Sequence, residues 1–284
     1  MTKGEVTKFQ FRPLTLDDKL AKDGIEAVGT LVGKEPCYIV GGMAGQSYLP
    51  TSCRRPTSDI DLSVVQPLNY ASFKKFAEPV KEFLKDNHYH VKERKHSRAF
   101  KLEVENSEGN RERLLIEFSR RNERNFDISR KKLERELENA KSKILEERNS
   151  TYVVASPEDI VIPKLTRIIN SMGRNKQLKR AIPNVKKPFS EEDIKKRLKL
   201  ISELREGAML EPTDLELAEK LRFVSDVYDI RILSELAGLN DKYFAKVCND
   251  WNTILQKTPE RDLLFESILP DFVINLKNNV DCNR

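Results

Sequence analysis

The chain has 284 residues, of which 38% are hydrophobic and 34% are charged, and its mean hydropathy is −0.58. This length allows one large domain or two of modest size. No apolar run is long enough to cross a bilayer, so no membrane partner is expected. The four cysteines have no CxxC spacing and the first residues lack the apolar core of a secretion signal, which predicts free thiols in a reducing cytoplasm.

The net charge is +6 and the calculated pI is about 9.0, which suits a polyanionic partner such as nucleic acid or a nucleotide. Between Arg174 and Lys187 the chain carries six basic residues and no acidic one. Pro183 within this stretch and Pro188 directly after it argue against one continuous helix, so a basic loop is expected. It is either a solvated linker or a segment that binds phosphates.

In chain order, apolar residues at helical spacing predict a helix over residues 15–33. The run CYIV predicts a short strand over 37–40, and MAGQSYL, which follows, a short helix. Alternating acidic and aliphatic residues predict a strand with one buried face over 59–65. Residues 69–86 predict another helix, with a proline inside it.

Three further strands are predicted over 88–94, 97–105 and 111–119, and the last two form a hairpin around SEGN at 107–110. The charged stretch 122–148 is expected to be helical and to lie outside the core.

Ser156 and the Pro-Glu-Asp that follows it form a strong helix start, and the remaining sequence is mainly helical. The sequence therefore predicts an α+β protein. A mixed-sheet domain with flanking helices spans residues 1–150, and a helical domain that completes the active cleft spans 151–284.

Gly41 and Gly42 end the first short strand, and Asp59 and Asp61 follow seventeen residues later. A glycine pair lets the backbone approach a bound phosphate closely. The two aspartates lie two positions apart on a strand, so both project from one face. Adjacent carboxylates repel each other unless a cation lies between them, and Mg²⁺ prefers such oxygen ligands.

A site of this kind commonly includes a third carboxylate on a neighbouring strand. Glu117, within the apolar run LLIEFS, is the candidate. The alternative for Glu117 is an ordinary outward-facing residue of a half-exposed sheet. The sequence therefore predicts a Mg²⁺ (or Mn²⁺) site made by Asp59, Asp61 and Glu117, able to support phosphoryl displacement.

The segment YIVGGMAG…RRPTSDIDLSVV resembles the start of the polymerase-β-type nucleotidyltransferase superfamily. Within it, the chain is most similar to the AbiEii-type (MenT-like) enzymes, which include toxins of type IV toxin–antitoxin systems. SPEDIVIPKLTRI and RFVSDVYDIRIL resemble later motifs of that family. The motifs occur in the family's order between residues 25 and 236.

The resemblance implies that Asp59 and Asp61 bind the metal, that Lys164 and Arg167 neutralise triphosphate charge, and that Asp226 lies in the active cleft facing the lysine. It further implies that the backbone at the glycine pair binds the nucleotide. The nucleotide-binding candidates are thus Gly41, Gly42, Ser58 and Arg55, together with Arg167. Met43 departs from the family, in which a Ser or Thr usually follows the glycine pair.

The implied reaction transfers a nucleoside monophosphate from an NTP to an acceptor hydroxyl. The family's toxins and the basic loop favour an RNA acceptor, with the 3′ end of tRNA as the candidate. The resemblance to the toxins also implies a cognate antitoxin as a candidate partner. One alternative is an aminoglycoside-type transferase that acts on a small molecule. The other is a non-catalytic nucleic-acid-binding or partner-binding protein, which Met43 favours.

Overall fold

The computed structural model describes residues 13–97, 99–106, 112–175, 178, 189–211 and 213–250, apart from the side chains of 249 and 250. They belong to two compact units. The sheet unit comprises the described parts of Gln10–Ser47 and Pro56–Ser156, and the helical unit those of Tyr48–Arg55 and Pro157–Arg284. The domain boundary at residue 150 stays a prediction. In the structure, the residues up to Ser156 pack with the sheet unit.

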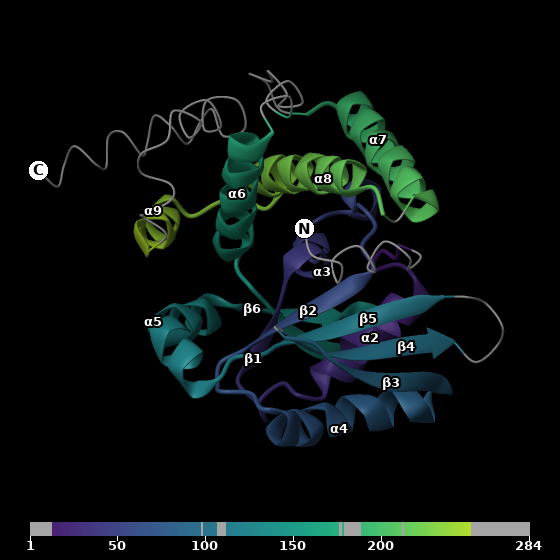
Figure 1. The fold of residues 1–284 in the computed structure, drawn as a ribbon, viewed down its shortest axis with the longest axis vertical. Helices are drawn as coiled ribbons and strands as arrows, with labels where there is room; N and C mark the ends of the chain where they lie inside the picture. Colours follow the sequence, from purple (N-terminus) through teal and green to yellow (C-terminus); the bar gives the residue numbers. More distant parts are fainter. Residues whose placement is uncertain are drawn as a thin grey trace, which may run out of the picture. The chain divides into compact units, whose positions relative to one another are not determined.

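The sheet unit is built around a seven-stranded mixed sheet with the order β3-β4-β5-β2-β1-β7-β6 (Figure 1). Its elements are α2 (Lys19–Gly29), β1 (Cys37–Val40), α3 (Gly41–Gln46), β2 (Asp59–Val64), α4 (Tyr70–Asp86), β3 (Tyr89–Lys95), β4 (Ala99–Asn106), β5 (Arg113–Ser119), α5 (Glu123–Asn139), β6 (Lys141–Leu145), η3 (Glu146–Arg148) and β7 (Ser150–Val154). Strand β2 pairs parallel with β5 and antiparallel with β1, so the sheet is mixed and the predicted α+β class is confirmed.

One face of the sheet is apolar, because successive side chains of a strand project to opposite faces and the apolar residues occupy alternate positions. Ile60 of β2 and Leu114 of β5 are fully buried and lie against Gly24 of α2. Helix α4 packs on the same face through Phe73, which stacks on Phe100 with ring centroids 4.8 Å apart. The residues between these positions in β2 and β5 therefore project to the opposite face, where the acidic side chains lie.

The predicted helix 69–86 is confirmed as α4, and its start has a clear local cause. Asn69 accepts a hydrogen bond from the Ser72 backbone N–H at 2.9 Å, and the Ser72 hydroxyl lies 3.1 Å from the Asn69 N–H. This reciprocal capping box satisfies two amide donors that the first helical turn leaves without partners.

Two predicted helices differ from the structure. The helix expected over 15–33 spans only Lys19–Gly29, because the Thr15 N–H donates a hydrogen bond to Asp18 Oδ2 at 2.6 Å and residues 30–34 form turns. Leu14, just before the predicted helix, forms a β-bridge with Thr57. The helix expected over 122–148 ends at Asn139, and Lys141–Leu145 forms β6 at the edge of the sheet. Pairing with β7 supplies backbone hydrogen bonds to this segment, so a tertiary partner overrides its charged, helix-compatible composition.

The three predicted strands of the meander are confirmed as β3, β4 and β5, which pair antiparallel in sequence order. The predicted turn at 107–110 lies outside the described residues. So does most of the basic loop, of which Arg174 is described at the end of a helix, with an ion pair to Glu219 at 2.9 Å.

The helical unit contains η2 (Thr51–Cys53), α6 (Pro157–Arg174), α7 (Glu191–Leu210), α8 (Leu215–Leu236) and α9 (Asp241–Asp250). Helix α6 begins at Pro157, as the sequence predicts. Helix α8 packs against both α6 and α7, and its middle is buried on almost every side. Within the described part of the chain, no helix has both the length and the apolar character that crossing a membrane needs.

The capping box gives a test of the local analysis. Replacing Asn69 by Ala removes the side-chain acceptor at the start of α4, so the free energy of unfolding should fall by about 1 kcal/mol. Urea unfolding followed by circular dichroism measures the change. Glu82→Ala, within the same helix, should change stability by less than about 0.5 kcal/mol, and an equal loss in both variants would contradict the role given to the cap.

Candidate metal and nucleotide site

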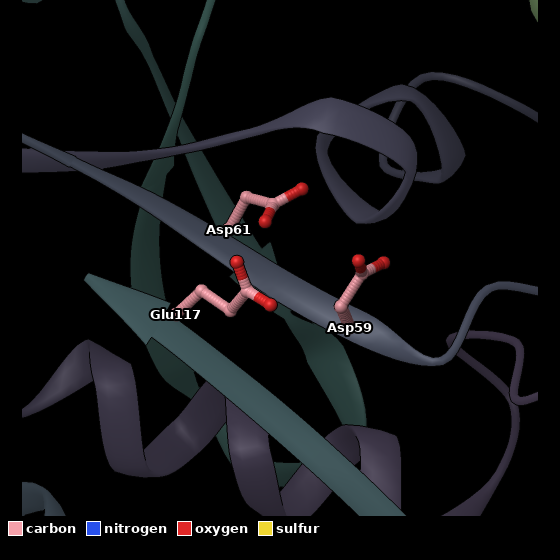
Figure 2. Close-up of side chains that lie close together, drawn as sticks. All are labelled: Asp59, Asp61 and Glu117. Carbon is pink, nitrogen blue, oxygen red and sulfur yellow. The ribbon is translucent and has the colours of Figure 1, made fainter. Parts of the chain in front are cut away.

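The pairing of β2 with β5 brings the acidic side chains together. Asp61 lies directly across from Glu117 in the parallel register, and Asp59 lies two residues earlier on the same face of β2. Figure 2 shows the three carboxyl groups projecting from this face toward one another. One oxygen of each lies within 4.8 Å of the others, so the three predicted metal ligands form one acidic cluster.

Gly41 lies so close to Asp61 that a side chain does not fit there. A Cβ at Gly41 would be 2.6 Å from Asp61 Oδ2, which is closer than non-bonded atoms approach. Its φ of +77° also lies in the left-handed region that disfavours other residues. The first glycine of the pair is therefore required both by the turn from β1 into α3 and by the position of the carboxylate.

Asp59 is held in place by the segment that precedes it. The Thr57 hydroxyl donates a hydrogen bond to Asp59 Oδ1 at 2.7 Å. The Thr57 backbone is fixed by two hydrogen bonds with Leu14, of 2.6 and 2.8 Å. The orientation of Asp59 thus depends on the β-bridge between Leu14 and Thr57.

The donor set fits a hard divalent cation. All three ligands are carboxylates, which Mg²⁺ and Mn²⁺ prefer, and they are only partly buried, which leaves room for water or phosphate oxygens. Their mutual repulsion is relieved when a cation lies between them. An exposed acidic group alone would not define such a site. Here, however, Gly41 leaves space for the Asp61 carboxylate, and the Thr57 hydroxyl orients Asp59.

Lys101 is a neighbour of this cluster that the sequence analysis did not identify. It lies across from Glu117 in the β4–β5 register, and its Nζ is 2.7 Å from Glu117 Oε1. The signal in the sequence is a lysine between Phe100 and Leu102, where strand alternation points it away from the apolar face. Without the strand register, nothing connects that lysine with Glu117.

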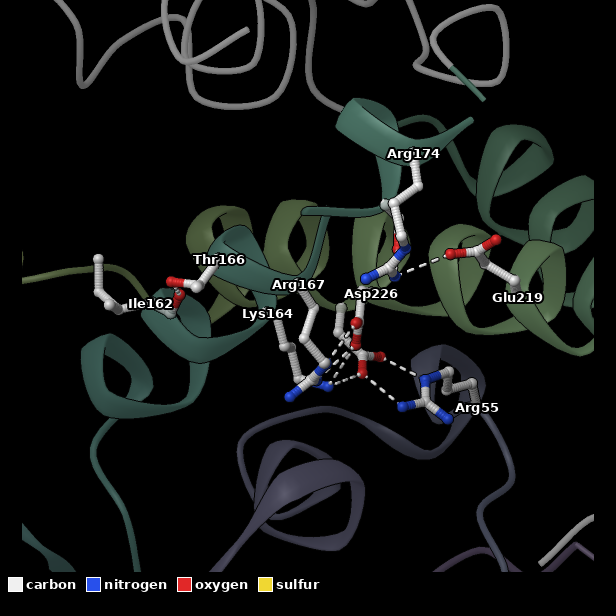
Figure 3. Close-up of polar contacts among 10 residues, drawn as sticks. Arg55, Ile162, Lys164, Thr166, Arg167, Arg174, Glu219 and Asp226 are labelled. Atoms are coloured by element: carbon white, nitrogen blue, oxygen red, sulfur yellow. Dashed lines mark hydrogen bonds and ion pairs between the residues drawn. The ribbon is translucent and has the colours of Figure 1, made fainter. Parts of the chain in front are cut away.

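A second charged cluster lies within the helical unit (Figure 3). Arg55 donates two hydrogen bonds of 2.6 Å to Asp229. Lys164 Nζ lies 2.7 Å from Asp229 and 3.2 Å from Asp226. Arg167 binds Asp226 through two hydrogen bonds of 2.8 and 2.9 Å. The predicted residues Lys164 and Arg167 of α6 therefore both contact Asp226 of α8. Arg55 belongs to the same cluster through Asp229.

Charge within this second cluster decides the ionisation of its two acids. Burial opposes ionisation of Asp226, but Arg167 and Lys164 hold the pKa of its carboxyl well below the ordinary value. For Asp229, burial likewise acts in the opposite direction, and Arg55 and Lys164 lower the pKa. Both carboxylates are therefore ionised at neutral pH and balance much of the positive charge around them.

The remaining predicted residues have clear positions. Ser58 is buried in the sheet unit with 3% of its surface exposed, and it directly precedes Asp59. Met43, which replaces the usual hydroxyl residue, is fully buried in α3, so it serves the core of the sheet unit. Gly42 follows Gly41 in the first turn of that helix.

Comparisons with known proteins match no family model and no curated protein. Among solved structures, an antigenic nucleotidyltransferase-like protein from Paracoccidioides brasiliensis matches with 16% identity and a TM-score of 0.38, over 74% of this chain and 95% of that one. MenT4, a nucleotidyltransferase toxin from Mycobacterium tuberculosis H37Rv, matches with 12% identity and a TM-score of 0.36, over 98% of each chain.

Terminal uridylyl transferase 4 from Trypanosoma brucei matches with 13% identity and a TM-score of 0.25, over 84% of this chain and 74% of that one. A MenT-like nucleotidyltransferase, the kind of protein that the sequence motifs resemble, is thus among the matches. Because the TM-scores are low, the function proposed below rests on the acidic cluster and its surroundings.

Replacing Gly41 by Ala should abolish divalent binding, because the added Cβ displaces the Asp61 carboxylate. Isothermal titration with MnCl₂ measures the binding. Gly33→Ala is the matched control, because Gly33 has a φ of +73° but nothing within 4 Å of the added atom. Both variants should lose about 1–2 kcal/mol of stability from the backbone conformation. Equal Mn²⁺ binding by the two would refute the steric argument.

Asp229→Asn should destabilise the protein at neutral pH by about 3–5 kcal/mol, because it leaves Arg55 and Lys164 without their shared carboxylate. The pKa of Asp229 is lowered in the folded state, so its ionised form stabilises the fold above the ordinary value of 3.8. That contribution is lost as the pH falls below this value.

The difference in the free energy of unfolding between wild type and Asp229→Asn should therefore become smaller as the pH falls from about 4 toward 2. Urea unfolding at a series of pH values measures it. Glu219→Gln is the control, because its partner Arg174 has 65% of its side chain exposed and the pair contributes little. A difference for Asp229→Asn that stays constant down to the lowest pH would contradict the assignment.

Proposed function

We propose that this protein is a metal-dependent nucleotidyltransferase that transfers a nucleoside monophosphate from an NTP to an acceptor hydroxyl. The observation that carries the proposal is the acidic cluster of Asp59, Asp61 and Glu117 beside a glycine that no other residue can replace without displacing Asp61. The motif order along the chain, which resembles the MenT-like enzymes, supports the same activity.

In the proposed reaction, the acceptor oxygen attacks the α-phosphorus of the NTP, and the bond from that phosphorus to the bridging oxygen breaks to release pyrophosphate. The proton of the acceptor hydroxyl passes to a carboxylate of the acidic cluster. The bound Mg²⁺ supplies positive charge that stabilises the phosphate oxygens as negative charge develops on them. The protein's own part is to hold three carboxylates on one rigid sheet face.

The glycine pair contributes space and backbone donors. With no side chain at Gly41 or Gly42, a phosphate can approach the backbone where β1 turns into α3. Met43 does not interfere with this role, because its side chain is fully buried.

Lys164, Arg167, Asp226 and Arg55 are proposed to serve the nucleotide as the family resemblance implies. Within the helical unit, Asp226 and Asp229 fix the cationic groups of Lys164 and Arg55 through short contacts. Arg167 has 43% of its side chain exposed, against 12% for Arg55 and 3% for Lys164, so it is the most exposed of the three cations. The basic stretch after Arg174 favours RNA as the acceptor, with the 3′ end of tRNA as the specific candidate, and a toxin-like role with a cognate antitoxin follows from the same resemblance.

The direct test is incubation with Mg²⁺, each α-labelled NTP in turn, and total cellular RNA and protein. Label should appear in RNA of tRNA size. Asp61→Asn should lower the rate of labelling more than about a hundredfold, since changes even to the groups around metal ligands cost 10–100-fold. Glu105→Gln, which alters a partly exposed carboxylate paired with Lys92, should retain activity.

Label in a small molecule or in protein would replace RNA as the acceptor while leaving the reaction type in place. Full activity of Asp61→Asn would refute the assigned site. A wild-type protein that labels nothing and binds no divalent cation would refute the enzyme proposal altogether.

A further inference from the structure

A lateral row of residues crosses four strands at the acidic cluster. Val40 of β1 pairs with Asp61 of β2, Asp61 with Glu117 of β5, and Glu117 with Lys101 of β4. Directly paired residues of neighbouring strands project to the same face of a sheet. The Lys101 ammonium group therefore lies on the face that carries the three carboxylates, one strand beyond the last of them.

The burial of Lys101 separates it from the other cations on this face. The cross-strand pairs Lys92–Glu105 and Arg94–Glu103 leave 57% and 55% of the basic side chain exposed. Lys101 has only 9% of its side chain exposed, and Glu117 has 13%. Exposed pairs of this kind contribute little, whereas a buried ammonium is rare unless it is paired. The Lys101–Glu117 pair thus acts at short range and with little screening by solvent.

The pair also changes the charge of the acidic cluster. Three carboxylates and one ammonium group, in their charged forms, carry a net charge of −2, which a single divalent cation balances. Glu117 cannot offer its full negative charge to a cation near Asp61 while Lys101 lies 2.7 Å from its Oε1. The fixed ammonium and a bound cation therefore compete for the same carboxylate.

We propose that Lys101 is a positioning residue that acts as a built-in counter-cation of the acidic cluster. Its ammonium group holds Glu117 in place beside Asp61 and weakens the binding of divalent cations in the absence of nucleotide. This inference rests on the proposed function, because it assigns Glu117 to the metal site. A simple cross-strand ion pair would only stabilise the sheet. The proposed role differs, because removal of the Lys101 charge makes the binding of divalent cations stronger.

The test is titration of the nucleotide-free, full-length protein with MnCl₂, measured by calorimetry. Lys101→Gln removes the charge and keeps a long polar side chain, so the Kd for Mn²⁺ should fall at least about fivefold. Lys101→Arg keeps the charge, so its Kd should stay within about twofold of wild type or rise. Lys92→Gln removes an exposed cation from the same face, where Lys92 pairs with Glu105 and does not lie across from Lys101, so it should leave the Kd unchanged.

A double variant shows whether the effect passes through Glu117. In a Glu117→Gln background, Lys101→Gln should no longer strengthen Mn²⁺ binding, because the carboxylate for which the two cations compete is gone. An unchanged or higher Kd for Lys101→Gln, or the same gain with and without Glu117, would overturn the inference. If Lys101→Gln does not fold, as judged by thermal unfolding, Lys101→Arg still decides: a Kd more than twofold below wild type overturns the proposal.

The two proposals fail in different ways. If wild type binds Mn²⁺ and labels an acceptor while Lys101→Gln leaves the Kd unchanged, the role of Lys101 is wrong and the enzyme proposal stands. If wild type neither binds Mn²⁺ nor labels any acceptor, the enzyme proposal fails and the role of Lys101 fails with it.

Discussion

Hydrogen bonds between β2 and the parallel strand β5 hold Asp61 beside Glu117, against the repulsion between two carboxylates. Parallel pairing needs a long connection, and here that connection is α4 with the meander of β3 and β4. The apolar faces of these same elements, where Phe73 stacks on Phe100, supply the stability that keeps the acids together. A well-packed core on one face of the sheet therefore supports an unfavourable charge arrangement on the other.

The surroundings of the acidic cluster show how closely its geometry is set. Gly41 leaves no space for even a methyl group beside Asp61, and Thr57 orients Asp59 from a segment that is itself fixed by Leu14. Lys101 adds a positive charge at the far side of Glu117. These contacts reach the three acids from three segments of the chain, around Gly41, Thr57 and Lys101, so the cluster is a property of the folded sheet unit and of no single motif.

The helical unit also holds like charges close together, but its cluster has an excess of positive charge. Arg55, Lys164 and Arg167 would repel one another if they were close together without acids. Asp226 and Asp229, one turn apart on α8, lie between them and bind all three. Both acids have a lowered pKa, so the arrangement persists well into the acidic range.

The sequence by itself determined the α+β class, the strand that carries Asp59 and Asp61, the helix of α4 and the start of α6, because each depends on local spacing, caps and alternation. It also identified Glu117 as a third acid. Only the tertiary structure decided that Lys141–Leu145 is an edge strand, that Lys101 pairs with Glu117, and that Arg55 binds Asp229 across 174 positions of the chain. Strand register and long-range ion pairs depend on which segments pack side by side. Local spacing and alternation in the sequence do not specify which segments these are.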